Sequence, residues 1–345
     1  MLRFAIPEYR LPKSVLRREL DLIEGVGVKM VFNTRVGFDL PLNELASRFD
    51  AVFLSIGTWK ESWLYLPGTE LKGVYPALPL LEVVAKREKA MLGSKVAIIG
   101  GGNAAIDSAR TVLRLGSEAT ILYRRERKDM PAIDEEIKAA EEEGVRFIFL
   151  AAPHRILGDA EGRVKAIEVV KTNLGEYDKS GRRRPISTDE VQRYKCDTVI
   201  LAVGETFDLD FCRASGLELK EEGTIVVDRF SLETSRKGFY AGGDVITGAS
   251  NVSNAMSGGK QAAQKIDERL MGPDLPGETR WEQLFQQFDY NRHAPGEPSL
   301  SRRHLARVLP ADVRVHSQDE VVAGLDSQEA LEECRRCLRC DLKAN

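Results

Sequence analysis

The feature that most constrains this chain is a glycine-rich turn between a predicted strand and a predicted helix. Residues 95–100 form a short apolar run that favours a buried strand, and residues 103–115 have apolar side chains at helical spacing. A second strand is predicted at 119–123. The turn between the first two elements, Gly100-Gly101-Gly102, fits the pattern G-x-G-x-x-A, which in this context predicts a βαβ unit that binds a dinucleotide.

Each small residue of this pattern has a distinct physical role. Gly100 permits the tight turn, and Gly102 lets a pyrophosphate approach backbone N–H groups at the positive end of the helix dipole. Ala105 is small enough for the helix to pack closely on the sheet. The alternative is a glycine-rich turn without a ligand. The candidate contacts to the nucleotide are Gly100, Gly101, Gly102, Asn103, Ala104, Ala105 and, after a later strand, Gly204.

Two arginines after the second strand indicate which dinucleotide binds. An NAD-binding unit usually has an acidic residue there, which accepts a hydrogen bond from the ribose 2′-hydroxyl. Here the strand is followed by Arg124 and Arg125, whose guanidinium groups suit a 2′-phosphate. The residues therefore favour NADPH over NADH. Two alternatives stay open, a solvated basic loop and a ribose contact from Glu126.

The order of predicted elements indicates an α/β protein. A helix at 133–143 and a strand at 146–150 extend the unit to βαβαβ, which requires a parallel sheet. Strands at 164–172 and 197–203 follow, with a polar basic loop at 175–193 between them, and a β-meander is expected in place of the third crossover. The remaining predicted elements are a helix at 14–24, strands at 28–32 and 51–55, and a charged helix at 327–338.

Two segments of the chain resemble each other. Residues 49–58, FDAVFLSIGT, and 196–205, CDTVILAVGE, share Asp, Val, Leu and Gly at identical offsets. Coincidence is the alternative; otherwise the segments are the closing strands of two related, nested domains. We therefore expect one domain from residues 1–77 and 204–272, a nucleotide-binding domain at 78–203, and a small C-terminal extension at 273–345.

Four segments resemble the small (β) subunit of NADPH-dependent glutamate synthase and its relatives. They are MLRFAIPEYRLP at residues 1–12, GGGNAAID from Gly100, YRRERKDMPA from Tyr123, and YAGGD at 240–244. The resemblance implies two nested Rossmann-like domains, one for NADPH and one for FAD. It also implies a flavin oxidoreductase in which a hydride passes from NADPH to FAD. Single electrons would then pass through iron–sulfur clusters to a larger partner, similar to the glutamate synthase α subunit or another iron–sulfur oxidoreductase.

The same resemblance implies the flavin contacts. Asp244 corresponds to the residue that accepts a hydrogen bond from a ribityl hydroxyl, beside Gly243, and residues 253–255 begin the helix that faces the flavin pyrimidine ring. The complete set is Val36, Gly57, Thr58, Gly243, Asp244, Ser253, Asn254 and Ala255. An FAD domain of this type opens with its own G-x-G-x-x-G unit, which this sequence lacks. We expect that unit to be missing from this piece or supplied by another chain; loss of FAD is the alternative.

Three of the five cysteines lie close together near the C-terminus. Cys334, Cys337 and Cys340 give the spacing C-x2-C-x2-C, which is used to hold iron–sulfur clusters. A [4Fe–4S] cluster with a fourth ligand from elsewhere is the preferred interpretation. Zinc, or a helix with no metal, is the alternative.

Composition and the remaining motifs exclude several function classes. A formal net charge of −3 does not suggest nucleic-acid binding. No run of apolar residues is long enough for a membrane span and no signal peptide is recognised, so the cytoplasm is expected. No redox-active C-x-x-C lies in the nucleotide regions, which disfavours disulfide reductase chemistry. Hydride transfer needs no acid or base, so we name no catalytic residue. The competing function is a structural or regulatory NADPH-binding subunit without FAD.

Overall fold

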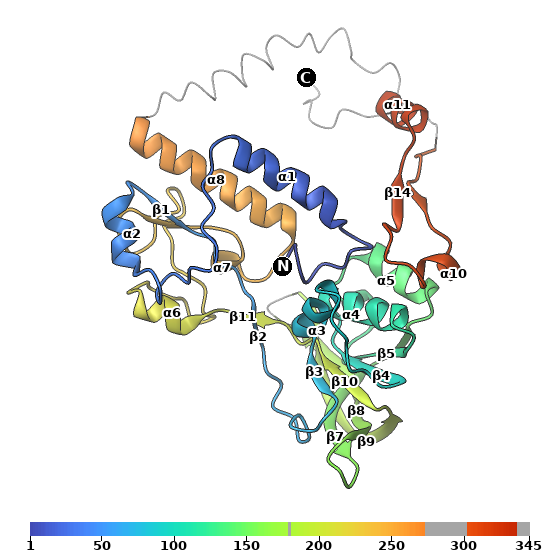
Figure 1. The fold of residues 1–345 in the computed structure, drawn as a ribbon. Helices are drawn as coiled ribbons and strands as arrows, with labels where there is room; N and C mark the ends of the chain where they lie inside the picture. The colour runs from blue at the N-terminus through green and yellow to red at the C-terminus, as the bar shows by residue number, and fades with distance from the viewer. Residues whose placement is uncertain (179–180, 273–301, 337–345) are drawn as a thin grey trace. The chain divides into compact units, whose positions relative to one another are not determined.

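The computed structural model describes residues 1–178, 181–272 and 302–336, and the chain forms two compact units (Figure 1). Unit 1 comprises residues 1–30, 59–206 and 309–321. Unit 2 comprises residues 31–58, 207–308 and 322–345. The predicted boundaries placed residues 1–30 and 59–77 with the flavin domain and 309–321 with the C-terminal extension. In the structure all three segments belong to unit 1 with the nucleotide-binding elements.

Unit 1 is built on a five-stranded parallel sheet with the order β3-β10-β4-β5-β6. The strands are short and nearly all apolar, as expected for a sheet covered on both faces. Their bounds are β3 Val74–Pro76, β4 Lys95–Ile99, β5 Glu118–Tyr123, β6 Arg146–Phe149 and β10 Thr198–Leu201. The sheet confirms the predicted α/β class and the predicted parallel βαβαβ unit.

Alternate residues of β4 enter different cores. Val96 and Ile98 pack with the helices, whereas Ala97 and Ile99 pack with an antiparallel meander on the other face (Figure 1). The helices are α3 Ala77–Ala85, α4 Asn103–Arg114 and α5 Asp134–Glu142, and the 3-10 turn η1 Arg127–Asp129 precedes α5. The meander comprises β7 Ala151–Gly158, β8 Val164–Tyr177 and β9 Arg183–Lys195. It confirms that a meander replaces the third crossover.

Two local predictions were wrong. Residues 175–193 were expected to be a loop, but most of them belong to the hairpin of β8 and β9. The far part of β9 is solvated on both faces, so its sequence lacks the alternation of apolar and polar residues that identifies a strand. Residues 28–32 were expected to be a strand, yet they form none, and Val28, Val31 and Phe32 are exposed.

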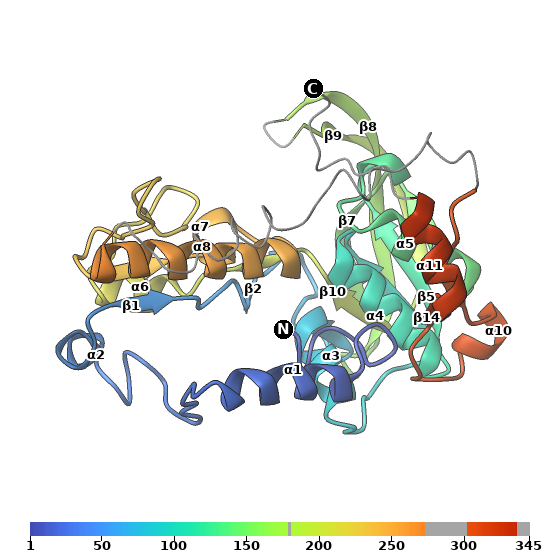
Figure 2. The ribbon, with the colours of Figure 1, turned by 90° about the horizontal axis from the view of Figure 1, so that it is seen from above.

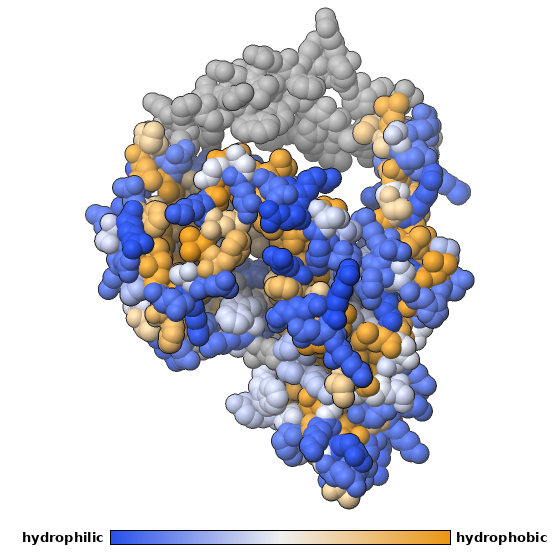
Figure 3. Space-filling model, in the orientation of Figure 1, coloured by the Kyte–Doolittle hydropathy of each residue, from blue (hydrophilic) through white to orange (hydrophobic). Residues whose placement is uncertain are grey.

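Unit 2 contains a smaller parallel pair of strands. β1 Val52–Leu54 pairs with β12 Phe239–Ala241, and helix α8 Val252–Met271 contacts β12. Figure 2 labels β1 and α8 of this unit. Its other elements are α2 Leu42–Arg48, α6 Leu209–Ala214, α7 Asp244–Thr247, β13 Arg307–Val308, β14 Val322–Gly324 and α11 Ser327–Arg336. Figure 3 shows apolar side chains among hydrophilic ones on this unit, and Phe38 and Phe49 are among the exposed ones.

The remaining elements of unit 1 are short except for the first helix. α1 Lys13–Gly25 confirms the helix predicted at 14–24, and β2 Lys60–Glu61 pairs antiparallel with β11 Glu205–Thr206. The 310–315 segment contains α10 Ala311–Arg314. Within the part of the chain that the structure describes, no helix is long and apolar enough to cross a membrane.

Candidate functional site

The glycine-rich turn connects β4 to α4 at the carboxyl edge of the parallel sheet. Gly100 has φ +146°, and a Cβ there would lie 2.2 Å from the Ala202 carbonyl oxygen. A Cβ on Gly101 would lie 2.4 Å from the Tyr123 ring. Only glycine fits these two positions, because one is conformationally strained and both are closely packed.

Gly102 differs from its two neighbours, because a Cβ there would meet no atom within 4 Å. It is the N-cap of α4, and no side chain caps this helix end. The N–H groups of Ala105 and Ile106 donate to the Gly102 carbonyl, so the donors that an α-helix start leaves to a ligand are those of residues 103 and 104. The open space beside Gly102 is suited to an anion that approaches the backbone.

Three other residues, Asn103, Ala104 and Ala105, stabilise the turn by packing and hydrogen bonding. Ala105 is fully buried and lets α4 pack against the sheet. Asn103 Oδ1 accepts a hydrogen bond from the Ile133 N–H at 3.1 Å, and the Gly101 carbonyl accepts one from Ala132 at 3.2 Å. The loop before α5 is thereby fastened to the glycine turn. Ala104 is partly buried in the same core.

The two arginines after β5 have different environments. Arg124 is exposed, whereas Arg125 is 5% exposed and bonds to Asp178 at 2.7 Å and to the Arg183 carbonyl at 2.7 Å. Although its side chain reaches solvent, desolvation by the surrounding protein atoms and the neighbouring Arg125 cation lower the pKa of Arg124. The sequence treated these residues as an equivalent pair, but Arg125 is already occupied within the protein.

Glu126 is also occupied. Its carboxylate lies 2.7 Å from Lys128 Nζ, and Glu126 and Asp129 form a reciprocal cap on η1. Glu126, the acidic residue that directly follows the two arginines, therefore already has partners in its own turn.

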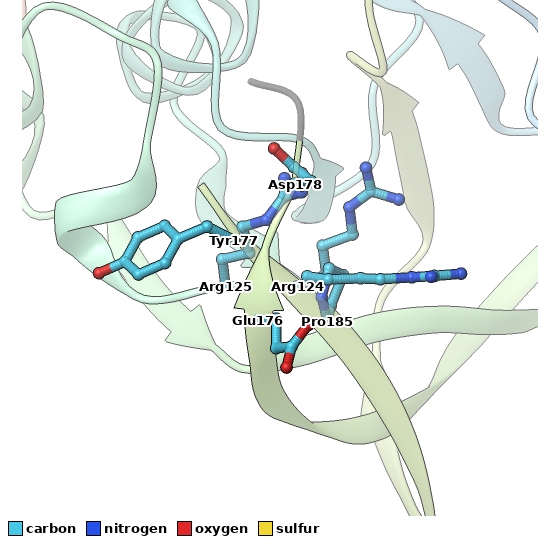
Figure 4. A pocket seen from close by; sticks show the side chains of 7 residues that line it. Arg124, Arg125, Glu176, Tyr177, Asp178 and Pro185 are labelled. Carbon is cyan, nitrogen blue, oxygen red and sulfur yellow. Dashed lines mark hydrogen bonds and ion pairs between the residues drawn. The ribbon is translucent and has the colours of Figure 1, made fainter. Parts of the chain in front are cut away.

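A pocket of about 560 Å³ adjoins the arginines. It is lined by Arg124, Arg125, Glu176, Tyr177, Asp178, Arg184 and Pro185, so the tip of the β8–β9 hairpin forms one wall (Figure 4). Sequence reasoning missed this wall because the hairpin was expected to be a loop. The run of three arginines, 182–184, was the signal that could have identified it.

Gly204 follows β10, which lies beside β4 in the sheet. Its φ is +109°, and a Cβ would meet no atom within 4 Å. The corresponding Gly57, three residues after β1 in unit 2, also has a positive φ of +64° and open space around it. Both glycines therefore end a parallel strand in the same way, which supports the relationship between segments 49–58 and 196–205.

The expected flavin contacts lie in unit 2. β1 and β12 are parallel, so Gly57 and Thr58 follow one strand at the same edge where Gly243 and Asp244 follow the other. The Gly242 N–H donates to the Leu54 carbonyl at 3.3 Å. Val36 packs at the margin of the core of this unit.

The turn after β12 is shaped by close backbone contacts. Gly243 has φ +73°, and a Cβ on Gly258 in α8 would lie 2.7 Å from the Gly243 nitrogen. Asp244 Oδ1 accepts a hydrogen bond from Ser250 Oγ at 2.6 Å. These residues fit a flavin ribityl chain, because small residues bring the backbone close and a carboxylate stands at the helix start.

The N-terminus of α8 is exposed, including Ser253, Asn254 and Ala255. Asn251 caps it, since its side chain accepts a hydrogen bond from the Asn254 N–H at 2.9 Å and its carbonyl accepts one from Ala255 at 3.1 Å. The backbone N–H groups of residues 254 and 255 therefore already donate hydrogen bonds within the helix start. The N–H groups that precede them, those of residues 252 and 253, are the candidates for a contact with the flavin.

The cysteine motif is only partly within the described residues. Cys334 is exposed on α11, and Cys337 and Cys340 lie outside the part that the structure describes. The described ranges contain no group of three potential metal ligands. Cys196 and Cys212 are buried, and burial raises the pKa of the Cys196 thiol to about 12, so it remains protonated.

Comparison with known proteins identifies relatives of this arrangement. The family model described as pyridine nucleotide-disulphide oxidoreductase matches residues 16–259. The chain is 36% identical to "NADP(+)-dependent formate dehydrogenase subunit beta" of Moorella thermoacetica, over 99% of this chain and 49% of that protein. It is 35% identical to "Glutamate synthase [NADPH] small chain" of Escherichia coli (strain K12), over 77% of this chain and 60% of that protein.

A solved structure of Mycobacterium tuberculosis FprA in complex with NADPH has the same fold. It superposes with a TM-score of 0.62 and 18% identity, over 82% of this chain and 76% of that chain. The chain spans about half the length of the first curated relatives that it matches.

Proposed function

Because this chain belongs to the pyridine nucleotide-disulphide oxidoreductase family, in the group that includes glutamate synthase small chains, we propose that it binds NADPH and passes its electrons to FAD. Family membership confirms the expected class, an NAD(P)H-dependent oxidoreductase. The observation that carries the proposal is the uncapped helix start at Gly102, beside an exposed arginine at the end of the neighbouring strand.

Unit 1 supplies the nucleotide site. The pyrophosphate would take hydrogen bonds from the first N–H groups of α4, and Gly100 and Gly101 hold the turn close to Ala202 and Tyr123. The Gly100 N–H donates to the Leu122 carbonyl at 3.2 Å, so the turn and the end of β5 are directly joined. This link supports the proposal that Arg124, which follows β5, contacts the adenosine ribose and its 2′-phosphate.

Unit 2 would hold the flavin with Asp244, Gly243 and the start of α8. When bound, the flavin supplies the redox group that accepts a hydride and can release electrons singly. The residues of the chain orient it: Asp244 offers an acceptor to a ribityl hydroxyl, and the α8 dipole favours negative charge at its N-terminus. The expected location is the cytoplasm.

The proposal predicts NADPH-dependent reduction of an artificial acceptor. Supplied with FAD and with the segment or chain that carries the missing G-x-G-x-x-G unit, the protein is expected to reduce ferricyanide with NADPH faster than with NADH, because Arg124 favours a 2′-phosphate. A visible flavin absorbance band after gel filtration would show that FAD is retained. NADPH binding without turnover would instead support the competing function, a structural or regulatory NADPH-binding subunit.

We further propose that electrons leave through an iron–sulfur centre to a larger subunit. Two observations support this: the motif of Cys334, Cys337 and Cys340, and relatives that are named as a beta subunit or a small chain. We expect anaerobically purified protein to contain iron and acid-labile sulfide, and the variant Cys334→Ser to lose most of both. Zinc in place of iron, or no metal, would contradict the cluster assignment.

A further inference from the structure

The β8–β9 hairpin is fastened to the segment that follows β5. Thr172 Oγ1 of β8 donates to the Arg124 carbonyl at 2.8 Å. Leu150, which precedes β7, donates its N–H to the Arg125 carbonyl at 3.2 Å and accepts a hydrogen bond from the Thr172 N–H at 2.8 Å. The ion pair between Arg125 and Asp178 lies at the tip of the same hairpin. The meander is therefore joined to the nucleotide edge of the sheet at several points.

Two arginine side chains in the pocket remain available to a ligand. Arg124 and Arg184 are both exposed and both line the pocket. Within the described ranges, neither guanidinium group makes a hydrogen bond or an ion pair. In contrast, Arg125 is turned toward Asp178, while Arg124 and Tyr177 point in opposite directions (Figure 4).

We propose that Arg184 is a second ligand of the NADPH 2′-phosphate, contributed by the hairpin, and that Arg125 is a positioning residue that holds the hairpin tip in place. This proposal rests on the proposed function and deepens it. The 2′-phosphate is doubly charged near neutral pH, and two guanidinium groups from different elements can neutralise it with charge-assisted hydrogen bonds. Asp178 neutralises Arg125, so Arg124 and Arg184 remain for the ligand.

The arrangement also accounts for the buried position of Arg125. Its Nε donates to the Arg183 carbonyl and its Nη2 to Asp178, so it spans the two strands of the hairpin next to Arg184. Arg125 would therefore act on the phosphate indirectly, because it holds Arg183 in place and so fixes the position of Arg184, the next residue on β9.

The test is the binding of two probes to the full chain by isothermal titration calorimetry. 2′,5′-ADP carries the 2′-phosphate, whereas 5′-AMP lacks it. We expect Arg184→Ala and Arg124→Ala each to weaken 2′,5′-ADP binding by about tenfold or more, the equivalent of one good charge-assisted hydrogen bond. Binding of 5′-AMP should change by less than about twofold.

The variant Arg193→Ala is the matched control, since Arg193 lies on the same strand but pairs with Glu168 outside the pocket. It should leave both affinities unchanged. Arg184→Lys should recover part of the lost 2′,5′-ADP affinity. Arg125→Ala should lower the preference for 2′,5′-ADP over 5′-AMP, and adding Arg184→Ala to it should cost less affinity than Arg184→Ala costs alone, because Arg125 acts through the position of Arg184. Additive losses would instead make Arg125 an independent ligand and overturn its positioning role.

The two proposals fail in different ways. If Arg124→Ala weakens 2′,5′-ADP binding and Arg184→Ala does not, the role of Arg184 is overturned and the NADPH assignment stands. If the unmodified chain binds both probes equally well, the preference for NADPH itself is overturned, and the role of Arg184 with it.

Discussion

Replacing Glu143 with alanine is expected to lower the free energy of unfolding by about 3–5 kcal/mol. Glu143 has no exposed side-chain surface and accepts hydrogen bonds from Arg110 at 2.6 Å, Arg114 at 2.7 Å and Arg314 at 2.9 Å. Its loss would leave three buried guanidinium groups short of a counter-charge. Urea denaturation measures the effect.

This cluster holds both terminal segments of unit 1 against α4. Tyr9 is fully buried beneath Arg110 and Arg114, and Arg314 reaches Glu143 from α10. The cluster contains four arginines and four carboxylates, namely Arg10, Arg110, Arg114 and Arg314 with Asp107, Glu136, Glu142 and Glu143. Removing its central carboxylate should therefore also loosen residues 1–30 and 309–321, which limited proteolysis would detect.

The control and the pH dependence make this prediction specific. Glu141→Ala, which breaks an ion pair to Arg127 near the surface, should cost less than about 1 kcal/mol. Burial opposes ionisation of Glu143, but hydrogen bonds from Arg110 and Arg114 outweigh it and hold its pKa at about 2, below the ordinary 4.5. Its stabilising contribution is therefore complete above pH 4.5 and is lost as pH falls toward 2. A difference between wild type and Glu143→Gln that stays constant over this range would contradict the assignment.

Replacing Gly102 with valine is expected to reduce NADPH affinity on the order of 100-fold and to leave the fold intact. The backbone at Gly102 has φ −87° and ψ 178°, which any residue adopts, and a Cβ would meet no protein atom within 4 Å. The new side chain would occupy the space in which the pyrophosphate approaches α4. Fluorescence titration with NADPH measures the loss.

Stability has to be measured in parallel. Unfolding of Gly102→Val should change by no more than about 1 kcal/mol, because glycine is only a moderately better N-cap than valine. Gly25→Val is a matched control, since Gly25 also has open space around it and lies at the end of α1. Unchanged NADPH affinity in Gly102→Val would place the pyrophosphate elsewhere. Gly100→Ala would be a poorer test, because its Cβ collides with Ala202 and disturbs the fold itself.

Local sequence patterns predicted the elements of the nucleotide-binding unit closely. β4, α4, β5, α5 and β6 form within one or two residues of the predicted bounds, because each combines a strong periodicity with a clear turn or cap. The β9 strand was missed because its exposed faces carry polar residues. The 28–32 segment was predicted as a strand because its apolar residues suggested burial, yet nothing in the described chain pairs with it.

The residues of the candidate site were likewise predicted from sequence only where a local pattern identified them. Gly100, Gly102, Ala105 and Arg124 were identified from sequence, because a glycine turn between a strand and a helix has few physical uses. Arg125 was grouped with Arg124 for its charge alone. The structure shows that it bonds to Asp178 and to the Arg183 carbonyl, 53 and 58 residues away, which no local pattern connects to it.

The sequence alone determined the α/β class and the parallel unit around Gly100, and it predicted a preference for a phosphorylated nucleotide, because these follow from short-range spacing and side-chain chemistry. Only the tertiary structure showed that Arg125 is paired with Asp178 while Arg124 is exposed. It also decided that residues 1–30 and 309–321 pack with the nucleotide-binding unit. Both outcomes depend on long-range ion pairs in buried surroundings, whose partners are set by the packing of the sheet, the hairpin and α4.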